Sequence, residues 1–247
     1  MILSIETSTN ICSVALHKNG ILLASQDLFG EQTHAGMITV LIDNILQQTQ
    51  TSKSQLTAIA VSDGPGSYTG LRIGSSTAKG LCFALDIPLL AVSTLEAMAL
   101  QVADAFVGMN AKGENIKGEN ILQNIPQNIL LAPMIDARRM EVYTALYQCK
   151  PTYSLDLELI SPIEPLIVDE DSFSNFIATN TILYFGNGAA KCQTTLKNPN
   201  FRFIDTILTS ARSIGKLAHQ NPKKVDIAYY ESLYLKEYMA KVAAKKF

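Results

Sequence analysis

Residues 56–85 read LTAIAVSDGPGSYTGLRIGSSTAKGLCFAL, and they contain the pattern on which the fold assignment depends. An apolar run predicts a buried strand over 56–61, and the glycine-rich turn Gly64-Pro65-Gly66-Ser67 separates it from a helix predicted over 71–85. Such a turn exposes backbone N–H groups that can bind phosphate, but it equally serves tight packing. It lacks the lysine of a P-loop, so the residues alone leave both interpretations open.

The first half of the chain alternates strands and helices around this turn. Asn19-Gly20 is a strong hairpin signal, because both residues tolerate a positive φ. Apolar positions cover more than one stripe of the helix expected over 34–49, so we expect it to bury two faces. The order indicates an α/β layer with a mixed sheet. We expect strands at 2–6, 11–17, 21–28, 56–61 and 88–92, and helices at 34–49, 71–85 and from Ser93 onward.

The second half repeats this layout. The short tandem repeat Gly113–Lys117 and Gly118–Ile121 indicates a flexible inserted loop over 108–128. After it, a strand, an acid, a short turn and a strand recur over 130–147, and a strand, a glycine-rich turn and a helix recur from 182. The sequence therefore predicts lobes at 1–107 and 129–209, the loop 108–128, and a C-terminal helix with a basic helical tail at 210–247.

Composition excludes several classes of protein. Of the 247 residues, 47% are apolar, which is too many for a disordered chain, and no apolar run is long enough to cross a bilayer. The N-terminus does not resemble a signal peptide, so we expect a cytoplasmic protein that contacts no membrane. Residues 216–247 carry seven lysines and three acids, which leaves −6 on residues 1–215. We expect such a chain to be a poor RNA binder on its own.

Three sets of residues are candidates for function. Gly70, Gly74 and Ala78 share one helix face and allow another helix to approach, either within the chain or from another subunit. Glu6 and Asp136 each end the first strand of a lobe, where acids hold Mg²⁺ in two-lobed nucleotide-binding folds. Ser76-Thr77-Ala78-Lys79 matches the Ser-x-x-Lys motif of serine acyl-enzymes, but the accompanying Lys-Thr-Gly is absent.

Several motifs together resemble one family. They are Ile5-Glu6-Thr7-Ser8, the block from Gly64 to Gly74, Ala78-Lys79-Gly80-Leu81, Ala91-Val92-Ser93-Thr94-Leu95 and Asp136-Ala137-Arg138-Arg139-Met140-Glu141-Val142-Tyr143. They resemble the bacterial tRNA threonylcarbamoyladenosine biosynthesis family TsaB, also called YeaZ, from residue 2 to about residue 235. The resemblance implies the actin-like, sugar-kinase-like ATPase fold of two RNase H-like lobes.

The same resemblance implies a function and partners. Members help to attach a threonylcarbamoyl group, donated by threonylcarbamoyl-AMP, to N6 of the adenosine 3′ to the anticodon in tRNAs reading codons that begin with A. The related subunit TsaD catalyses the transfer, the ATPase TsaE takes part, and tRNA is reached through the complex. TsaD carries a metal-binding His-x-x-x-His, and Thr94 and Met98 stand in those two places here. We therefore expect no catalytic residue and no metal site in this chain.

The resemblance also implies where the chain binds. The helices 34–49 and 71–85 are expected to contact TsaD or a second copy of the chain. The interface residues expected on them are Met37, Leu41, Ile45, Gly70, Gly74 and Ala78. No cofactor is required, but ATP or ADP with Mg²⁺ at the junction of the complex would involve Glu6, Gly64, Gly66, Ser67 and Asp136. The family usually has Asp where Glu6 stands.

Two other functions are open at this point. The first is an independent ATPase or small-molecule kinase of the same fold, which would depend on Glu6 and Asp136. The second is a protease or acyl-transferase, which would depend on a bound metal or on Ser76. The residues favour an accessory subunit of a threonylcarbamoyl transferase complex over both.

Overall fold

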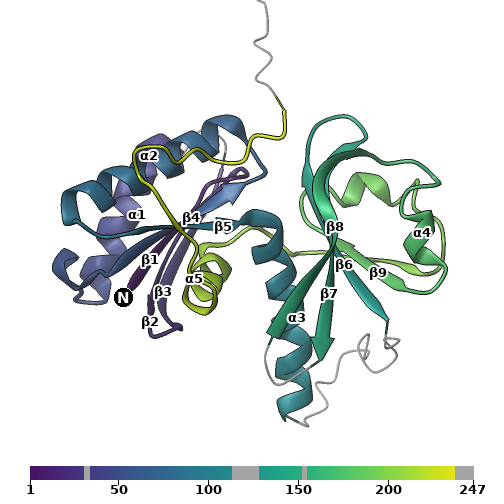
Figure 1. Cartoon of the computed structure of the whole chain (residues 1–247), viewed down its shortest axis with the longest axis horizontal. Helices are drawn as coiled ribbons and strands as arrows, with labels where there is room; N and C mark the ends of the chain where they lie inside the picture. The colour runs from purple at the N-terminus through teal and green to yellow at the C-terminus, as the bar shows by residue number, and fades with distance from the viewer. Residues whose placement is uncertain (31–33, 113–127, 152–154, 237–247) are drawn as a thin grey trace, which may run out of the picture.

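The chain folds into two α/β lobes joined side by side (Figure 1). The structure is a computed structural model, and it describes residues 1–30, 34–112, 128–151 and 155–236. Within these residues no helix is long and apolar enough to cross a bilayer.

The first lobe is built on a six-stranded mixed sheet in the order β11-β5-β4-β1-β2-β3. Strands β1, β2 and β3 pair antiparallel, whereas β4 and β5 follow β1 in parallel. Alternate residues of β4 face opposite sides, with Ile59 and Val61 toward α1 and α2, and Ala58 and Ala60 toward α5. The elements are β1 (Ile2–Glu6), β2 (Ile11–Lys18), β3 (Ile21–Phe29), α1 (His34–Gln48), η1 (Lys53–Gln55), β4 (Ala58–Gly64), α2 (Tyr68–Leu85), β5 (Leu89–Ser93), α5 (Ala211–Gln220) and β11 (Lys224–Val225).

The second lobe has a five-stranded sheet in the order β10-β9-β6-β7-β8. Strands β6, β7 and β8 pair antiparallel, whereas β9 and β10 follow β6 in parallel. The second sheet therefore repeats the order and directions of β1 to β5. This repetition agrees with two RNase H-like lobes and confirms the predicted α/β fold class. The elements are β6 (Ile129–Asp136), β7 (Glu141–Pro151), β8 (Leu155–Ile167), α4 (Ser174–Ile177), β9 (Thr181–Phe185), η2 (Ala190–Cys192) and β10 (Phe201–Ile204).

Helix α3 (Thr94–Lys112) lies between the lobes and packs against both. Leu95, Met98 and Val102 join a core with β6, β7 and β9. Ala97 and Leu100 pack on the other side against α5, β4 and β5. Because α3 runs to Lys112, residues 108–112 of the expected loop are helical, and residues 113–127 lie outside the described residues.

Several predicted boundaries differ from the structure. Helix α2 begins at Tyr68, three residues early, because the Ser67 hydroxyl accepts a hydrogen bond from Gly70 N and caps it. A helix follows the turn after β9 as predicted, but it is the short 3-10 helix η2. Helix α5 packs on β1 and β2, so it belongs to the first lobe.

The expected helical tail is also wrong for the part that is described. Residues 221–236 run as an extended segment that includes β11 and a turn at 227–229. Here β11 adds an antiparallel edge to β5. Residues 237–247 lie outside the described residues.

The small-residue face of α2 is turned into its own lobe. Ala78 is fully buried, and a Cβ on Gly70 would lie 2.0 Å from the Thr7 carbonyl oxygen. A Cβ on Gly74 would lie 2.3 Å from Thr7 Oγ1, which itself donates to Gly70 O at 2.8 Å. The expectation that these three residues face a partner is therefore wrong, because the close approach that they allow is to the end of β1.

Two of the expected interface residues on α1 are also core residues. Leu41 and Ile45 are buried in the cluster beneath α1 and α2, and Met37 is half-buried. The second apolar face of α1 is covered within the chain by α2. A partner on this side must contact other residues of the two helices.

Substitution of Gly70 by Ala tests this packing. Because the new methyl group would meet backbone rather than a flexible side chain, we expect a loss of about 1–3 kcal/mol in the free energy of unfolding. Gly80→Ala is the control on the same helix, since nothing lies within 4 Å of its Cβ position. That change should stabilise the protein by about 1 kcal/mol through helix propensity. Urea unfolding of both variants measures the effect, and a neutral Gly70→Ala would contradict the packing.

Candidate functional site

The glycine-rich turn is bound to the turn that follows β1. Ser67 N donates to Ser8 O at 2.6 Å, and a Cβ on Gly66 would lie 2.4 Å from the same oxygen. Gly64 has φ of 101°, a conformation that favours glycine. The turn is thus held against residues 7–8 of its own lobe, and the N–H group of Ser67 is already used.

The C-terminal strap, residues 223–236, covers this turn. Tyr230 donates its hydroxyl to Asp63 Oδ1 at 3.0 Å, and Leu233 N donates to Asp63 O at 2.7 Å. A Cβ on Gly64 would lie 2.8 Å from Leu233 O. The chain's own backbone therefore occupies the space beside Gly64 that a phosphate would need.

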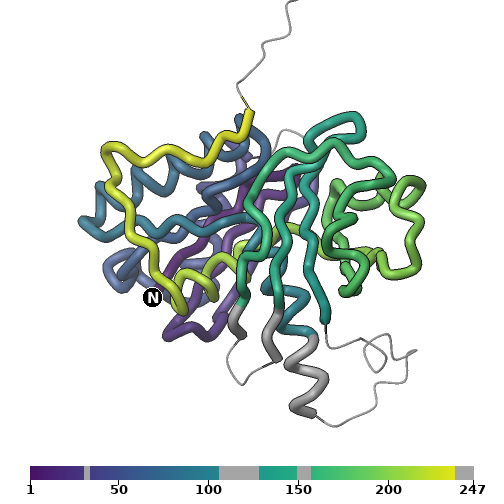
Figure 2. Tube along the Cα trace, turned by 45° about the vertical axis from the view of Figure 1, so that its right-hand side comes forward, coloured from purple at the N-terminus to yellow at the C-terminus, as the bar shows by residue number. Residues whose placement is uncertain are grey.

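The strap continues from the first lobe to the second. The rings of Tyr234 and Tyr68 lie 4.9 Å apart, and Lys236 then forms an ion pair with Glu141. Figure 2 shows this yellow segment rising beside the first lobe and crossing toward the second. Sequence reasoning missed the strap, and the aromatic residues that anchor it were its only local signal.

Glu6 is not available to a metal ion. Its side chain is 1% exposed, Oε1 accepts a hydrogen bond from Ser8 N at 2.5 Å, and Oε2 has no partner among the described residues. Burial raises the pKa of this carboxyl, against the smaller effect of hydrogen bonds from Ser8. Burial therefore makes the ionised form of this carboxyl costly, whereas an Mg²⁺ site requires that form.

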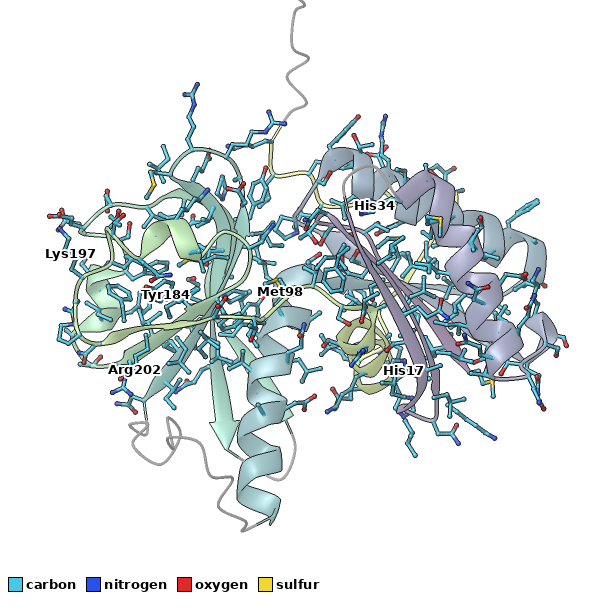
Figure 3. The ribbon with its side chains drawn as sticks, turned by 180° about the vertical axis from the view of Figure 1, so that it is seen from behind. His17, His34, Met98, Tyr184, Lys197 and Arg202 are labelled. Carbon is cyan, nitrogen blue, oxygen red and sulfur yellow. The ribbon has the colours of Figure 1, made fainter. Side chains whose placement is uncertain are left out.

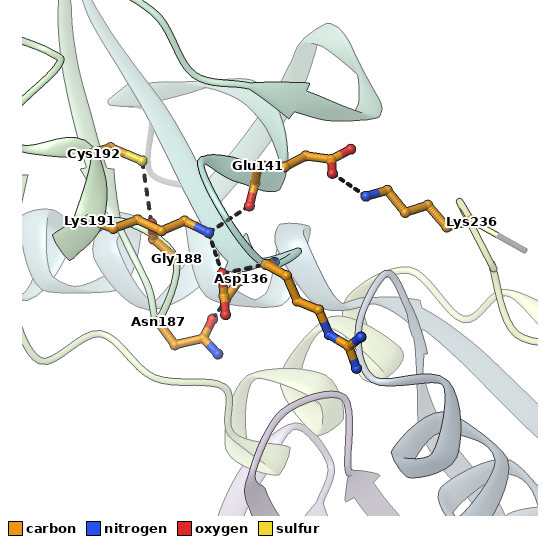
Figure 4. Close-up of polar contacts among 8 residues, drawn as sticks. Asp136, Glu141, Asn187, Gly188, Lys191, Cys192 and Lys236 are labelled. Carbon is orange, nitrogen blue, oxygen red and sulfur yellow. Dashed lines mark hydrogen bonds and ion pairs between the residues drawn. The ribbon is translucent and has the colours of Figure 1, made fainter. Parts of the chain in front are cut away.

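Asp136 is exposed but already paired (Figure 4). It forms an ion pair with Lys191, and its Oδ1 accepts from Arg138 N at 3.1 Å. Lys191 also donates to Glu141 O at 2.7 Å, which holds the ammonium group between β6 and β7. A lysine thus supplies the positive charge that a metal ion would otherwise bring to this strand end.

These contacts do not fit Mg-nucleotide binding by this chain alone. The strap covers Gly64, Glu6 is buried and Asp136 is neutralised by Lys191. No group of three or more potential metal ligands occurs among the described side chains. We therefore assign no nucleotide-dependent step to these residues.

The open surface of the first lobe is a groove between α1 and α2. It has a volume of about 640 Å³ and is wide open to solvent. Arg72 is exposed on its wall, with its guanidinium 4.6 Å from the centre of the Tyr68 ring. His34, labelled in Figure 3, is the first residue of α1; its side chain is buried and its Nε2 has no partner among the described residues. The lining residues are Ala35, Ile38, Thr39, Tyr68, Thr69, Arg72, Ile73, Ser76 and Thr77.

Thr94 and Met98 are both buried on α3, and Met98 lies where the helix meets the second lobe (Figure 3). Thr94 is fully buried, and the Met98 methyl group would lie 2.5 Å from a Cβ on Gly186. Met98 belongs to the core between α3 and the second sheet. A catalytic metal ligand at this position would have to be accessible to solvent or substrate, whereas the Met98 thioether is buried in the core.

Replacement of Glu6 by Gln tests the state of the buried carboxyl. The variant keeps the size of the side chain and an oxygen for Ser8 N. Because the pKa of Glu6 is raised in the folded protein above its ordinary value of 4.5, the wild type loses stability as pH rises beyond that value. The variant lacks this contribution from Glu6. Between pH 4.5 and the raised pKa of Glu6 in the folded protein, we therefore expect the variant's unfolding free energy, relative to that of the wild type, to grow by about 1.4 kcal/mol per pH unit.

Urea unfolding of both proteins between pH 4.5 and 8 measures this difference. Other buried acids, such as Asp63 and Glu96, are common to both proteins and cancel in the comparison. A difference that stays constant with pH would show that Glu6 titrates alike in the folded and unfolded states.

Known proteins similar to this chain are named as TsaB or as the related transferase TsaD. A family model described as TsaD, tRNA N6-adenosine threonylcarbamoyltransferase, matches residues 29–158. The tRNA threonylcarbamoyladenosine biosynthesis protein TsaB of Bacillus subtilis is 29% identical over 92% of this chain and 85% of that protein. TsaB of Haemophilus influenzae is 36% identical over 58% of this chain and 51% of that protein.

A solved structure supports the same assignment. A protein of Pseudomonas aeruginosa, described as similar to peptidase YeaZ, superposes with a TM-score of 0.73 and 26% identity. The match covers 95% of this chain and 99% of that one. The repeated sheet order, the matched motifs and these relatives together show that the chain belongs to the TsaB (YeaZ) family, whose role is in tRNA threonylcarbamoyladenosine biosynthesis.

Proposed function

We propose that the chain is a non-catalytic subunit needed for threonylcarbamoyl transfer to N6 of the adenosine 3′ to the anticodon. It would act by binding and activating TsaD, with TsaE and tRNA joining the complex. The observation that carries the proposal is the packing of Met98, which stands where the resemblance places one of the two metal-binding histidines of TsaD. A thioether in an apolar core can neither bind that metal nor contact a substrate.

The docking surface that we propose is the groove between α1 and α2. Tyr68 and Arg72 stack there, and Tyr and Arg are the residue types most enriched at energetically important interface positions. The wall also presents apolar Ile73 and hydroxyl groups such as Thr69 and Thr77, a mixture typical of a non-obligate interface. A second copy of the chain is the competing occupant of this groove.

The independent ATPase gains no support from the geometry. Its catalytic acids would be Glu6 and Asp136, of which one is buried and the other is paired with Lys191. A nucleotide at the junction of the complex would have to be held mainly by residues of the partner. The acyl-transferase alternative gains no support either, because the described residues contain no group of metal ligands and Lys79, the lysine of its motif, lies 5.7 Å from the centre of the Tyr230 ring.

Reconstitution with separate omissions tests the proposed function. Purified TsaD, TsaE, threonylcarbamoyl-AMP, ATP and unmodified tRNA are combined with or without this chain, and modified adenosine is quantified by mass spectrometry. We expect product only when this chain and TsaD are both present. Equal product without the chain would overturn the proposal, and product from the chain without TsaD would make it the catalyst.

Charge reversal at Arg72 tests the docking groove. Arg72 is exposed, so Arg72→Glu should leave the thermal transition within a few degrees while it weakens TsaD binding at least about tenfold, since a central interface arginine typically costs more than 1 kcal/mol. Arg202→Glu is the matched control, because it makes the same charge change at the outer end of the second lobe (Figure 3). Titration calorimetry measures both affinities. Equal affinities for the two variants would place the interface elsewhere.

A further inference from the structure

The turn between β6 and β7 carries two arginines in an unfavourable backbone conformation. Arg138 has φ of 74° and Arg139 has φ of 50°, a region that favours Gly, Asn or Asp. Hydrogen bonds from Ala137 N to Glu141 O and from Glu141 N to Arg138 O, both 3.1 Å, fix this shape. The hairpin between β6 and β7 accounts for two positive φ angles, but turns of this kind prefer Asn, Asp or Gly, so the presence of two arginines suggests a role for their side chains.

The neighbouring acids do not neutralise these arginines. Asp136 pairs with Lys191 and Glu141 pairs with Lys236, as Figure 4 shows. Arg138 and Arg139 are both exposed, and neither forms an ion pair with any residue that the structure describes. The turn therefore presents two uncompensated guanidinium groups, because the two carboxylates beside it, Asp136 and Glu141, are already paired with lysines.

We infer that Arg138 and Arg139 bind backbone phosphates of the tRNA substrate. Guanidinium groups bind phosphate oxygens in two-pronged hydrogen bonds, and the hydrogen-bonded turn carries the two arginines on consecutive residues of an ordered backbone. The inference rests on the proposed function, because tRNA reaches the turn only if the chain belongs to the modifying complex. Most of the affinity comes from the other subunits, since residues 1–215 carry a net charge of −6.

Asparagine replacement separates a binding role from a structural one. In the double variant Arg138→Asn, Arg139→Asn, both residues suit a positive φ, so the folded protein should be at least as stable as the wild type. Loss of two phosphate contacts should weaken tRNA binding by about tenfold at 50 mM KCl and reduce the slope of log K against log salt by about 2. Fluorescence anisotropy of labelled unmodified tRNA, titrated with the full complex with TsaD at 50–200 mM KCl, measures both quantities.

Two control variants complete the experiment. Lys197→Gln, Arg202→Gln removes two charges at the outer end of the same lobe (Figure 3) and should leave affinity and slope close to those of the wild type. Arg138→Lys, Arg139→Lys keeps the charge and should keep the salt slope. If the asparagine variant binds tRNA like the wild type, or no more weakly than the outer-end control, the inference is overturned.

The outcome can be distinguished from failure of the proposed function. If omission of the whole chain leaves tRNA modification unchanged, the proposed function fails. If omission abolishes modification while the asparagine variant binds tRNA normally, the proposed function stands and only the phosphate contact is removed.

Discussion

The two-sided packing of α3 is the constraint on which the rest of the structure depends. Each sheet leaves an apolar face toward the middle of the molecule, and α3 packs against the second sheet on one side and against α5 and the first sheet on the other. Met98 and Val102 face the second sheet, while Leu100 faces α5, and the ion pair between Lys216 and Asp104 at 2.5 Å fastens α5 to α3. A substitution on α3 therefore alters both the packing of a core and the contact between the lobes. This requirement limits which residues of α3 can serve as catalytic groups or metal ligands.

Tight packing also leaves little open space at the glycine-rich turn after β4. A turn of this kind can bind phosphate, but in this chain its glycines admit neighbouring backbone, with Ser8 beside Gly66 and Leu233 beside Gly64. The strap then continues to Glu141 in the second lobe. The groups at this turn that could bind a ligand already contact other parts of the chain. Binding of a partner protein would therefore use other surfaces, such as the groove between α1 and α2.

The order of the elements could be predicted from the sequence, whereas the direction in which each surface faces could not. Period-two and helical patterns located the strands and the three longest helices of the first lobe, since these signals are local. The spacing of Gly70 and Gly74 indicated a close approach but not its partner, because β1 is sixty residues away. Tyr230 and Tyr234 lie in a segment expected to be helical. Contacts with parts of the chain distant in sequence, among them Asp63, Tyr68 and strand β5, hold that segment in an extended course.

Two ion pairs determine the net charge of the turn between β6 and β7. Lysines from distant parts of the chain, Lys191 and Lys236, occupy both carboxylates beside the turn, and exposed ion pairs of this kind add little stability. Their larger effect is electrostatic: a turn that would otherwise be neutral keeps the positive charge of its arginines. An acidic chain thus presents a small positive surface at one defined point. Such an arrangement suits a subunit that positions a polyanion for another protein, because strong binding of its own would slow release of the product.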